Sequence, residues 1–202
     1  LTIPARWSGM HGAATVAAGL LEQQEGVRRV TVVETETAAM TLALVARVAA
    51  RLVAAGSDDR SVIGAVRRAE GAVRAYGSLA TLTYVARSGR VPALVAGISN
   101  TLHVRPVFRM QRGETGRVAL SRTTNGVLDA LAKAAGDLAA DPQRVLLFHA
   151  DAEAEARRLG ERLEMVLPIE GCEQIALSPI AGAYTGPGAF GFAALPANLT
   201  AA

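Results

Sequence analysis

Long runs of helix-forming residues predict several helices along the chain. The clearest run is "AAMTLALVARVAARLVAA" at residues 38–55, in which Arg47 and Arg51 stand one turn apart on the predicted wet face. Gly56 ends this helix, and Ser57 is predicted to cap a second helix over residues 58–76. Further helices are predicted over residues 8–24, 83–87, 92–100, 123–139 and 151–167.

Shorter apolar runs between these helices predict strands. "RRVTVVE" at residues 28–34 is typical of a buried strand. Residues 1–3 are typical of the remnant of another strand. "QRGETG" at residues 111–116 predicts the turn of a hairpin between strands at 104–110 and 116–121. Other strands are predicted at residues 78–82, 144–150, 174–177 and 190–194. Strands that alternate with helices predict an α/β architecture, in which the hairpin makes the second sheet mixed.

The stretch "YGS" at residues 76–78 is the predicted boundary between two α/β domains. Residues 1–76 are then the remainder of an N-terminal α/β domain, and residues 77–202 form a C-terminal α/β domain with a mixed sheet. Because the first residues resemble the end of a strand, we expect the chain to begin inside a domain.

Composition narrows the classes of function. Half of the 202 residues are hydrophobic, enough for a substantial core. The formal charge of +3 comes from scattered arginines with a single lysine, Lys133, so nucleic-acid binding is not expected. One cysteine, Cys172, and no charged-then-apolar leader favour a cytoplasmic protein. Residues 175–202 carry no charge, but three prolines interrupt them, so no integral membrane segment is expected.

The motif "WSGMHGAA" places Ser8 and Gly9 where a loop becomes a helix. A serine hydroxyl and free backbone N–H groups at a helix start suit an anion, although Ser8 can also be simply an N-cap. A small hydrolase or phosphotransferase that uses Ser8 is the alternative function. The three histidines have no spacing typical of a catalytic triad or a metal site, and we expect no catalytic residue, metal or cofactor.

Five segments, in order, resemble the DegV family of bacterial fatty-acid-binding proteins. They are "IPARWSGMHGAA", "TLTYVARSGRV", "LHVRPVFRMQRGETGRVALSRT", "VLLFHADAEAEA" and "GAYTGPGAFG". The resemblance implies two α/β domains that hold one long-chain fatty acid between them, with the carboxylate where the domains meet. It also implies a separate fatty-acid kinase that converts the bound ligand to an acyl phosphate, so the protein would be a lipid carrier rather than an enzyme.

The same resemblance assigns the carboxylate-binding residues. Ser8 and Gly9 match the serine-glycine helix start of the family, and Arg90 matches its basic residue near the head group. Tyr184 stands at the histidine position of the family, beside Thr185. A tyrosine donates a hydrogen bond but carries no positive charge near neutral pH. The family's threonine-serine-proline segment would precede the first residue, which implies that the N-terminal part of the first domain is missing.

Overall fold

The computed structural model describes residues 1–24, 30–89 and 104–200. Its strands are β1 (Arg74–Ser78), β2 (Arg105–Gln111), β3 (Glu114–Ser121), β4 (Gln143–Ala150), β5 (Ile169–Ala176) and β6 (Ala189–Pro196). The longer helices are α1 (Met10–Glu22), α2 (Ala39–Ala54), α3 (Asp59–Ala72), α6 (Thr124–Ala135) and α7 (Glu153–Glu164). Two short helices are α4 (Thr83–Ser88) and α8 (Pro179–Thr185), and 3₁₀ turns follow α6 and β6.

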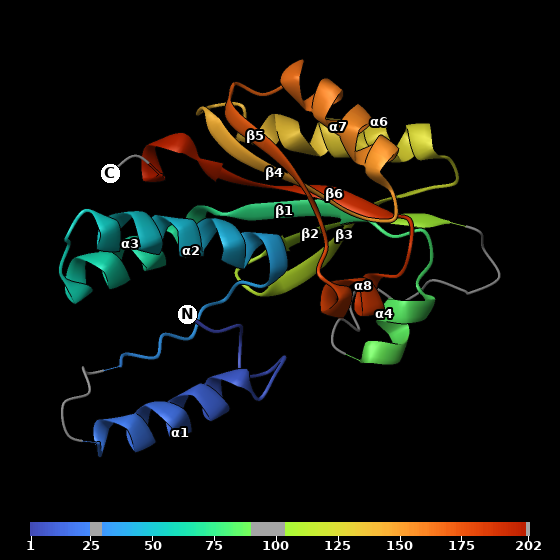
Figure 1. Cartoon of the computed structure of the whole chain (residues 1–202). Helices are drawn as coiled ribbons and strands as arrows, with labels where there is room; N and C mark the ends of the chain where they lie inside the picture. Colours follow the sequence, from blue (N-terminus) through green and yellow to red (C-terminus); the bar gives the residue numbers. More distant parts are fainter. Residues whose placement is uncertain (25–29, 90–103, 201–202) are drawn as a thin grey trace.

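One six-stranded sheet, in the order β3-β2-β1-β6-β4-β5, organises these elements (Figure 1). Strands β4 and β5 are parallel, joined by α7, and every other neighbouring pair is antiparallel. The prediction of an α/β protein with a mixed sheet is therefore confirmed. The predicted hairpin is also confirmed, since β2 and β3 pair on either side of a turn at Arg112 and Gly113.

Helices cover both faces of this sheet (Figure 1). Helices α6 and α7 pack on one face over a core that includes Leu128, Leu159 and the stacked rings of Tyr76 and Phe192. Helices α2 and α3 pack on the other face over a second core, around Val45, Val66 and Leu146. Because strand side chains alternate between faces, the two cores share the same strands.

Helix α1 lies apart from the sheet, beyond the loop that leads to α2 (Figure 1). Only Ala18 of this helix is buried, while Val16 and Leu20 are exposed. The segment before α1 lies beside the segment before α2, and the two form a parallel bridge between Thr2 and Glu34. Of the strand predicted over residues 28–34, residues 28 and 29 lie outside the described part, and residues 30–34 form only this bridge.

Two boundaries near β1 correct the sequence prediction. Helix α3 ends at Ala72 rather than residue 76, and the strand expected at 78–82 occupies Arg74–Ser78. Strand pairing sets both boundaries, because β1 is hydrogen-bonded to β2 and to β6. This pairing outweighs the weak local preference for helix. The cap of α3 is Asp58 rather than Ser57, since the Asp58 carboxylate accepts the Ser61 N–H at 2.9 Å.

The predicted domain boundary at residue 76 falls within β1, and the division into two domains stays a prediction. The predicted positions of α1, α2 and α4 are confirmed within two residues at each end. The helix expected at 92–100 lies outside the described residues. Helix α8 was not predicted. Its stretch contains two prolines and four glycines between residues 179 and 191, which favour turns over helix in a single sequence.

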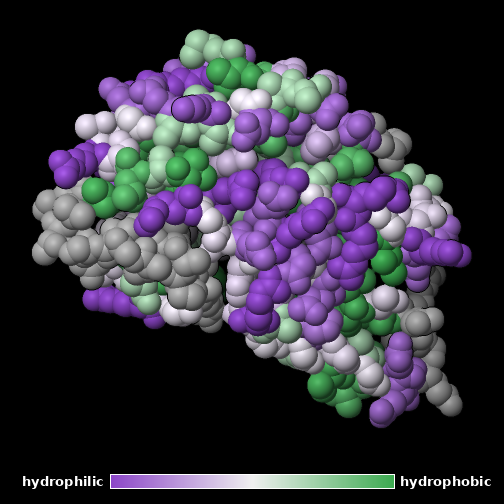
Figure 2. All heavy atoms as spheres, turned by 180° about the vertical axis from the view of Figure 1, so that it is seen from behind, coloured by the Kyte–Doolittle hydropathy of each residue, from purple (hydrophilic) through white to green (hydrophobic). Residues whose placement is uncertain are grey.

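The surface shows no wide apolar band on the face seen in Figure 2. Hydrophilic side chains occupy its centre, and apolar side chains gather in separate patches around them. Within residues 1–24, 30–89 and 104–200, no helix combines the length and apolar character that a bilayer-spanning helix needs.

Candidate functional site

An apolar cavity of about 210 Å³ lies on the face of the sheet that carries α2. Three parts of the chain enclose it: the strands, the segments beside Trp7 and the start of α2, and the helices α4 and α8. Its lining residues are Trp7, Ala38, Ala39, Met40, Ala75, Leu79, Val85, Ser88, Phe108, Met110, Thr115, Phe148, Leu177, Ala181, Tyr184 and Thr185. No lining residue carries a formal charge at neutral pH, so the cavity suits an apolar molecule.

Paired glycines make room for the aromatic floor of this cavity. Gly77 of β1 and Gly191 of β6 are cross-strand partners at the centre of the sheet. A Cβ atom on Gly77 would lie 2.9 Å from the Phe108 ring and 3.0 Å from the Phe148 ring. The absence of side chains at both positions therefore lets the two phenylalanine rings lie close to the sheet and face the cavity.

Three hydroxyl-bearing side chains lie on the side of the cavity formed by α4 and α8. Ser88 Oγ donates to the Val85 carbonyl at 2.7 Å, and Thr185 Oγ1 donates to the Ala181 carbonyl at 3.1 Å. Tyr184 is 38% exposed, so its ring lies between the cavity and solvent. To donate to a ligand, the serine and threonine hydroxyls must rotate away from their helix carbonyls. Their oxygens remain able to accept a further hydrogen bond.

The segment "TGPG" shapes the end of α8. Gly186 has φ +75° and ψ 168°, a conformation that is essentially restricted to glycine. Gly188 also has positive φ, and its N–H donates to the Ala150 carbonyl at 2.7 Å. Pro187 lies between them. The turn directs the chain from α8 into β6, so that Tyr184 and Thr185 stay at the cavity.

Ser8 and Gly9 lie just before α1, as the sequence predicts, but their capping roles differ from the expected ones. Gly9 is the N-cap residue, and Ser8 Oγ accepts the Met10 N–H at 3.2 Å. Neither residue lines the cavity, whereas the adjacent Trp7 does. Arg90, the fifth predicted site residue, lies outside the described residues. The structure thus places Tyr184 and Thr185 at the cavity. Ser8 and Gly9 do not line it and only follow the lining residue Trp7 in the sequence.

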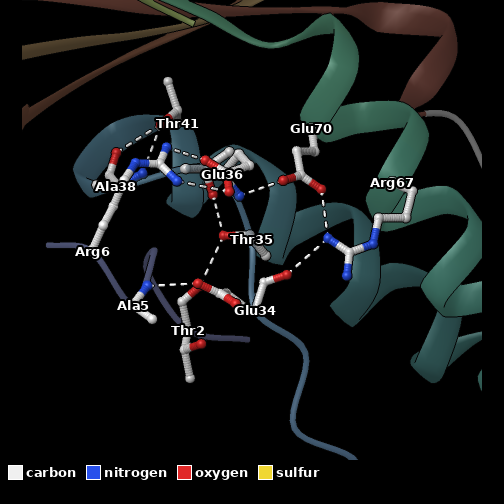
Figure 3. A network of polar contacts seen from close by, with 11 residues as sticks. Thr2, Ala5, Arg6, Glu34, Thr35, Glu36, Ala38, Thr41, Arg67 and Glu70 are labelled. Atoms are coloured by element: carbon white, nitrogen blue, oxygen red, sulfur yellow. Dashed lines mark hydrogen bonds and ion pairs between the residues drawn. The ribbon is translucent and has the colours of Figure 1, made fainter. Parts of the chain in front are cut away.

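Trp7 is held near the cavity by a network of polar contacts around Arg6 (Figure 3). The Arg6 guanidinium pairs with the Glu36 carboxylate through both terminal nitrogens, one of them at 2.9 Å from Oε1. The Glu36 backbone N–H in turn donates to Glu70 of α3, and Glu70 pairs with Arg67 at 2.9 Å. The hydrogen bond from Arg6 lowers the pKa of Glu36 below its usual value. The segment before α1 is thereby tied to α3.

The histidines of the described residues do not form a catalytic arrangement with Ser8. His11 Nδ1 lies 3.1 Å from Thr2 Oγ1, and His149 Nδ1 is buried and has no hydrogen-bond partner in the described part of the chain. The structure records no hydrogen bond between Ser8 and either ring. Within the same residues, no group of three histidine, cysteine, aspartate or glutamate side chains could hold a metal ion.

The sequence did not identify most of the lining residues. Ala75, Phe108 and Phe148 come from three strands that the fold brings together from distant parts of the chain. The alternation of "PVFRM" in β2 gives a partial signal, because Phe108 and Met110 are two residues apart and share one face. The pairing that joins this face to β1 and β4 is not visible locally.

Comparison with known proteins gives consistent matches over nearly the whole chain. A protein of Streptomyces coelicolor that contains a DegV domain is 34% identical over 196 residues, which cover 95% of this chain and 67% of that protein. A DegV domain-containing protein of Mycobacterium tuberculosis is 27% identical over 169 residues, or 80% of this chain and 59% of the relative. The chain therefore spans roughly two thirds or less of these relatives.

Solved structures give the same fold. A DegV family protein from Thermus thermophilus, described as binding fatty acid, is 26% identical and superposes with a TM-score of 0.86, over 96% of this chain and 69% of that one. A DegV family protein from Corynebacterium glutamicum is also 26% identical, with a TM-score of 0.84 over 97% and 74% of the two chains. The family model described as "Uncharacterised protein, DegV family" matches residues 1–197, and the chain belongs to the DegV family.

Proposed function

We propose that this protein binds a long-chain fatty acid with the acyl chain in the apolar cavity. The observation that carries the proposal is the cavity itself, which has an aromatic floor at Phe108 and Phe148 and no charged residue among the described residues that line it. The Thermus thermophilus relative described as binding fatty acid has the same fold and supports the assignment. A flexible apolar tail fits such a lining, whereas a polar metabolite would leave its hydrogen-bonding groups unpaired.

The acyl chain supplies most of the affinity. Burial of about sixteen methylenes at about 0.8 kcal/mol each contributes roughly 13 kcal/mol, before several kcal/mol of ordering cost are subtracted. The carboxylate contributes mainly orientation. Hydrogen bonds to it offset the free-energy cost of removing its charge from water rather than adding net affinity.

The carboxylate end of the ligand is proposed to lie toward Tyr184 and Thr185. Both line the cavity, and their hydroxyls can donate to a carboxylate. Ser8 and Gly9 are proposed to close the same end from the loop beside Trp7, with Arg90 as a cationic partner. This arrangement combines neutral donors with one guanidinium, which suits a single negative charge.

We further propose that the bound fatty acid is presented to a separate kinase that forms an acyl phosphate. The partially exposed Tyr184 marks the side of the cavity from which a partner could reach the carboxylate. The protein then acts as a carrier and performs no chemistry itself. No observation on Ser8 favours a hydrolase, since its hydroxyl oxygen accepts a backbone N–H and no histidine bonds to it among the described residues.

A pair of tryptophan substitutions on α8 tests the binding site. Ala181 lines the cavity, whereas Ala183 is exposed and does not. We expect Ala181→Trp to fill the cavity and weaken binding of a fluorescent fatty acid by about tenfold or more, since the added ring displaces several methylenes. Ala183→Trp is the control and should bind normally. Equal affinity of the two variants would place the ligand elsewhere.

A further inference from the structure

A second cavity, separate from the apolar one, is surrounded by three arginines. It has a volume of about 40 Å³ and lies between α2 and the strands β4 and β5. Its charged lining residues are Arg47 and Arg51 of α2, Arg144 of β4 and Glu173 of β5. A single water needs roughly 10–15 Å³, so the cavity has room for a small polyatomic ion.

The positive charge in this cavity exceeds the negative charge. Arg47 binds both carboxylate oxygens of Glu173, at 2.7 and 2.8 Å, and so neutralises it. Arg51, an exposed residue, donates to the neutral Thr200 carbonyl at 2.6 Å and so keeps its charge unpaired in this contact. No ion pair of the described residues involves Arg51 or Arg144. Among the residues that the structure describes, two guanidinium charges therefore remain around the cavity after the one carboxylate is paired.

Arg144 also has an unused donor. Its Nε–H is buried and has no hydrogen-bond partner within the described part of the chain. Buried guanidinium donors are nearly always bonded, so an unpaired one at the wall of a cavity points to a bound acceptor. The chain makes room for this side chain at Gly171, its neighbour on β5, where a Cβ atom would lie 2.9 Å from a terminal nitrogen of Arg144.

From this cavity we infer a binding site for a phosphate group, held by Arg51 and Arg144 and bordered by the Arg47–Glu173 pair. A phosphate dianion matches the two uncompensated charges, and its several oxygens can accept from Arg51 and from the free Nε–H of Arg144. The same three arginines lower the pKa of Glu173, chiefly through the hydrogen bonds from Arg47, which keeps this carboxylate ionised and bound to Arg47. The ligand is either free phosphate or a small phosphomonoester.

Isothermal titration calorimetry with inorganic phosphate, at constant ionic strength, tests the site. We expect saturable binding to the unmodified protein and a loss of about tenfold to a hundredfold in affinity for Arg144→Gln, the range of one or two charge-assisted hydrogen bonds. Arg60→Gln, which removes an exposed arginine of α3 away from this cavity, is the control and should bind as before. Arg51→Gln gives the same test if Arg144→Gln does not fold.

A parallel titration with glycerol 3-phosphate separates the two sources of the phosphate group. Binding of both probes assigns the site to phosphomonoesters, and binding of inorganic phosphate alone assigns it to the free ion. The inference is overturned if inorganic phosphate shows no saturable binding to the unmodified protein. It is also overturned if folded Arg144→Gln and Arg51→Gln variants bind inorganic phosphate as tightly as Arg60→Gln does.

Discussion

Substitution of Gly186 by alanine tests how the turn after α8 holds the cavity wall. Gly186 has φ +75° and ψ 168°, where a residue with a Cβ atom is strained by about 1–3 kcal/mol. The added Cβ atom would also lie 2.6 Å from Cε2 of Tyr84 on α4. That contact requires the ring to move, at an overpacking cost of about 1–3 kcal/mol. Alanine also lowers the conformational entropy of the unfolded chain, which offsets about 0.4–1 kcal/mol of this loss of stability.

Together these contributions predict that Gly186→Ala lowers the free energy of unfolding by about 1–5.5 kcal/mol. The lower part of this range applies if the ring of Tyr84, which is 36% exposed, turns toward solvent. Guanidinium chloride unfolding, followed by circular dichroism, measures the change as a shift of the midpoint at constant slope.

Gly182→Ala provides the matched control on the same helix. Gly182 has ordinary helical geometry, and a Cβ atom there would meet no heavy atom within 4 Å. Alanine at this position should stabilise the protein slightly, by about 0.5–1 kcal/mol. If the two variants unfolded at the same denaturant concentration, the turn at Gly186 would not constrain the packing of α8 against α4.

Two further substitutions follow from the site and from the polar network of Figure 3. Because Arg6 lowers the pKa of Glu36, this carboxylate stabilises the fold above its unfolded pKa of about 4.3, and the stabilisation disappears as the pH falls through the lower folded value. Glu36→Gln should therefore be less stable than the unmodified protein at pH 7 and equally stable near pH 2. The difference at pH 7 should not exceed about 1 kcal/mol, because Arg6 and Glu36 are both partly exposed. A stability difference that persists unchanged at pH 2 would show that it does not come from the Arg6–Glu36 ion pair. Tyr184→His should increase acyl-phosphate formation with a fatty-acid kinase and change fatty-acid affinity little, because an imidazolium stabilises developing negative charge where a tyrosine supplies only a hydrogen bond. Weaker binding without a gain in turnover would mean that Tyr184 only packs over the cavity.

The elements with strong local signals could be predicted from the sequence. Helix α2 follows from its unbroken helix formers, and the β2–β3 hairpin follows from a turn with glycines at two positions. The prediction for strand β1 is wrong by several residues, because its position is fixed by pairing with β2 and β6, in which the paired residues lie 29 or more positions away in the sequence. Local propensity cannot report such pairing.

The residues of the candidate site also divide into those with a local sequence signal and those that only the tertiary fold brings together. Tyr184 and Thr185 belong to a motif whose glycines have positive φ or close neighbours, so the sequence carries a physical signal for the turn beside the cavity. Their assignment as carboxylate-binding residues rests on the resemblance to the DegV family and stays a prediction. Phe108 and Phe148 were not found, because each is an ordinary strand residue until the sheet places it beside the Gly77–Gly191 pair. The second cavity, which Arg51 and Arg144 line, combines residues from α2, β4 and β5 and likewise depends on the tertiary fold.

Native mass spectrometry of the protein as purified tests fatty-acid binding most directly. We expect a population heavier than the polypeptide by the mass of a long-chain fatty acid, which denaturation releases. The same measurement on Ala181→Trp should show that population strongly reduced, while Ala183→Trp retains it. A protein that carries no added mass, and that also fails to take up added palmitate before a second measurement, would contradict the assignment of the apolar cavity to a fatty acid.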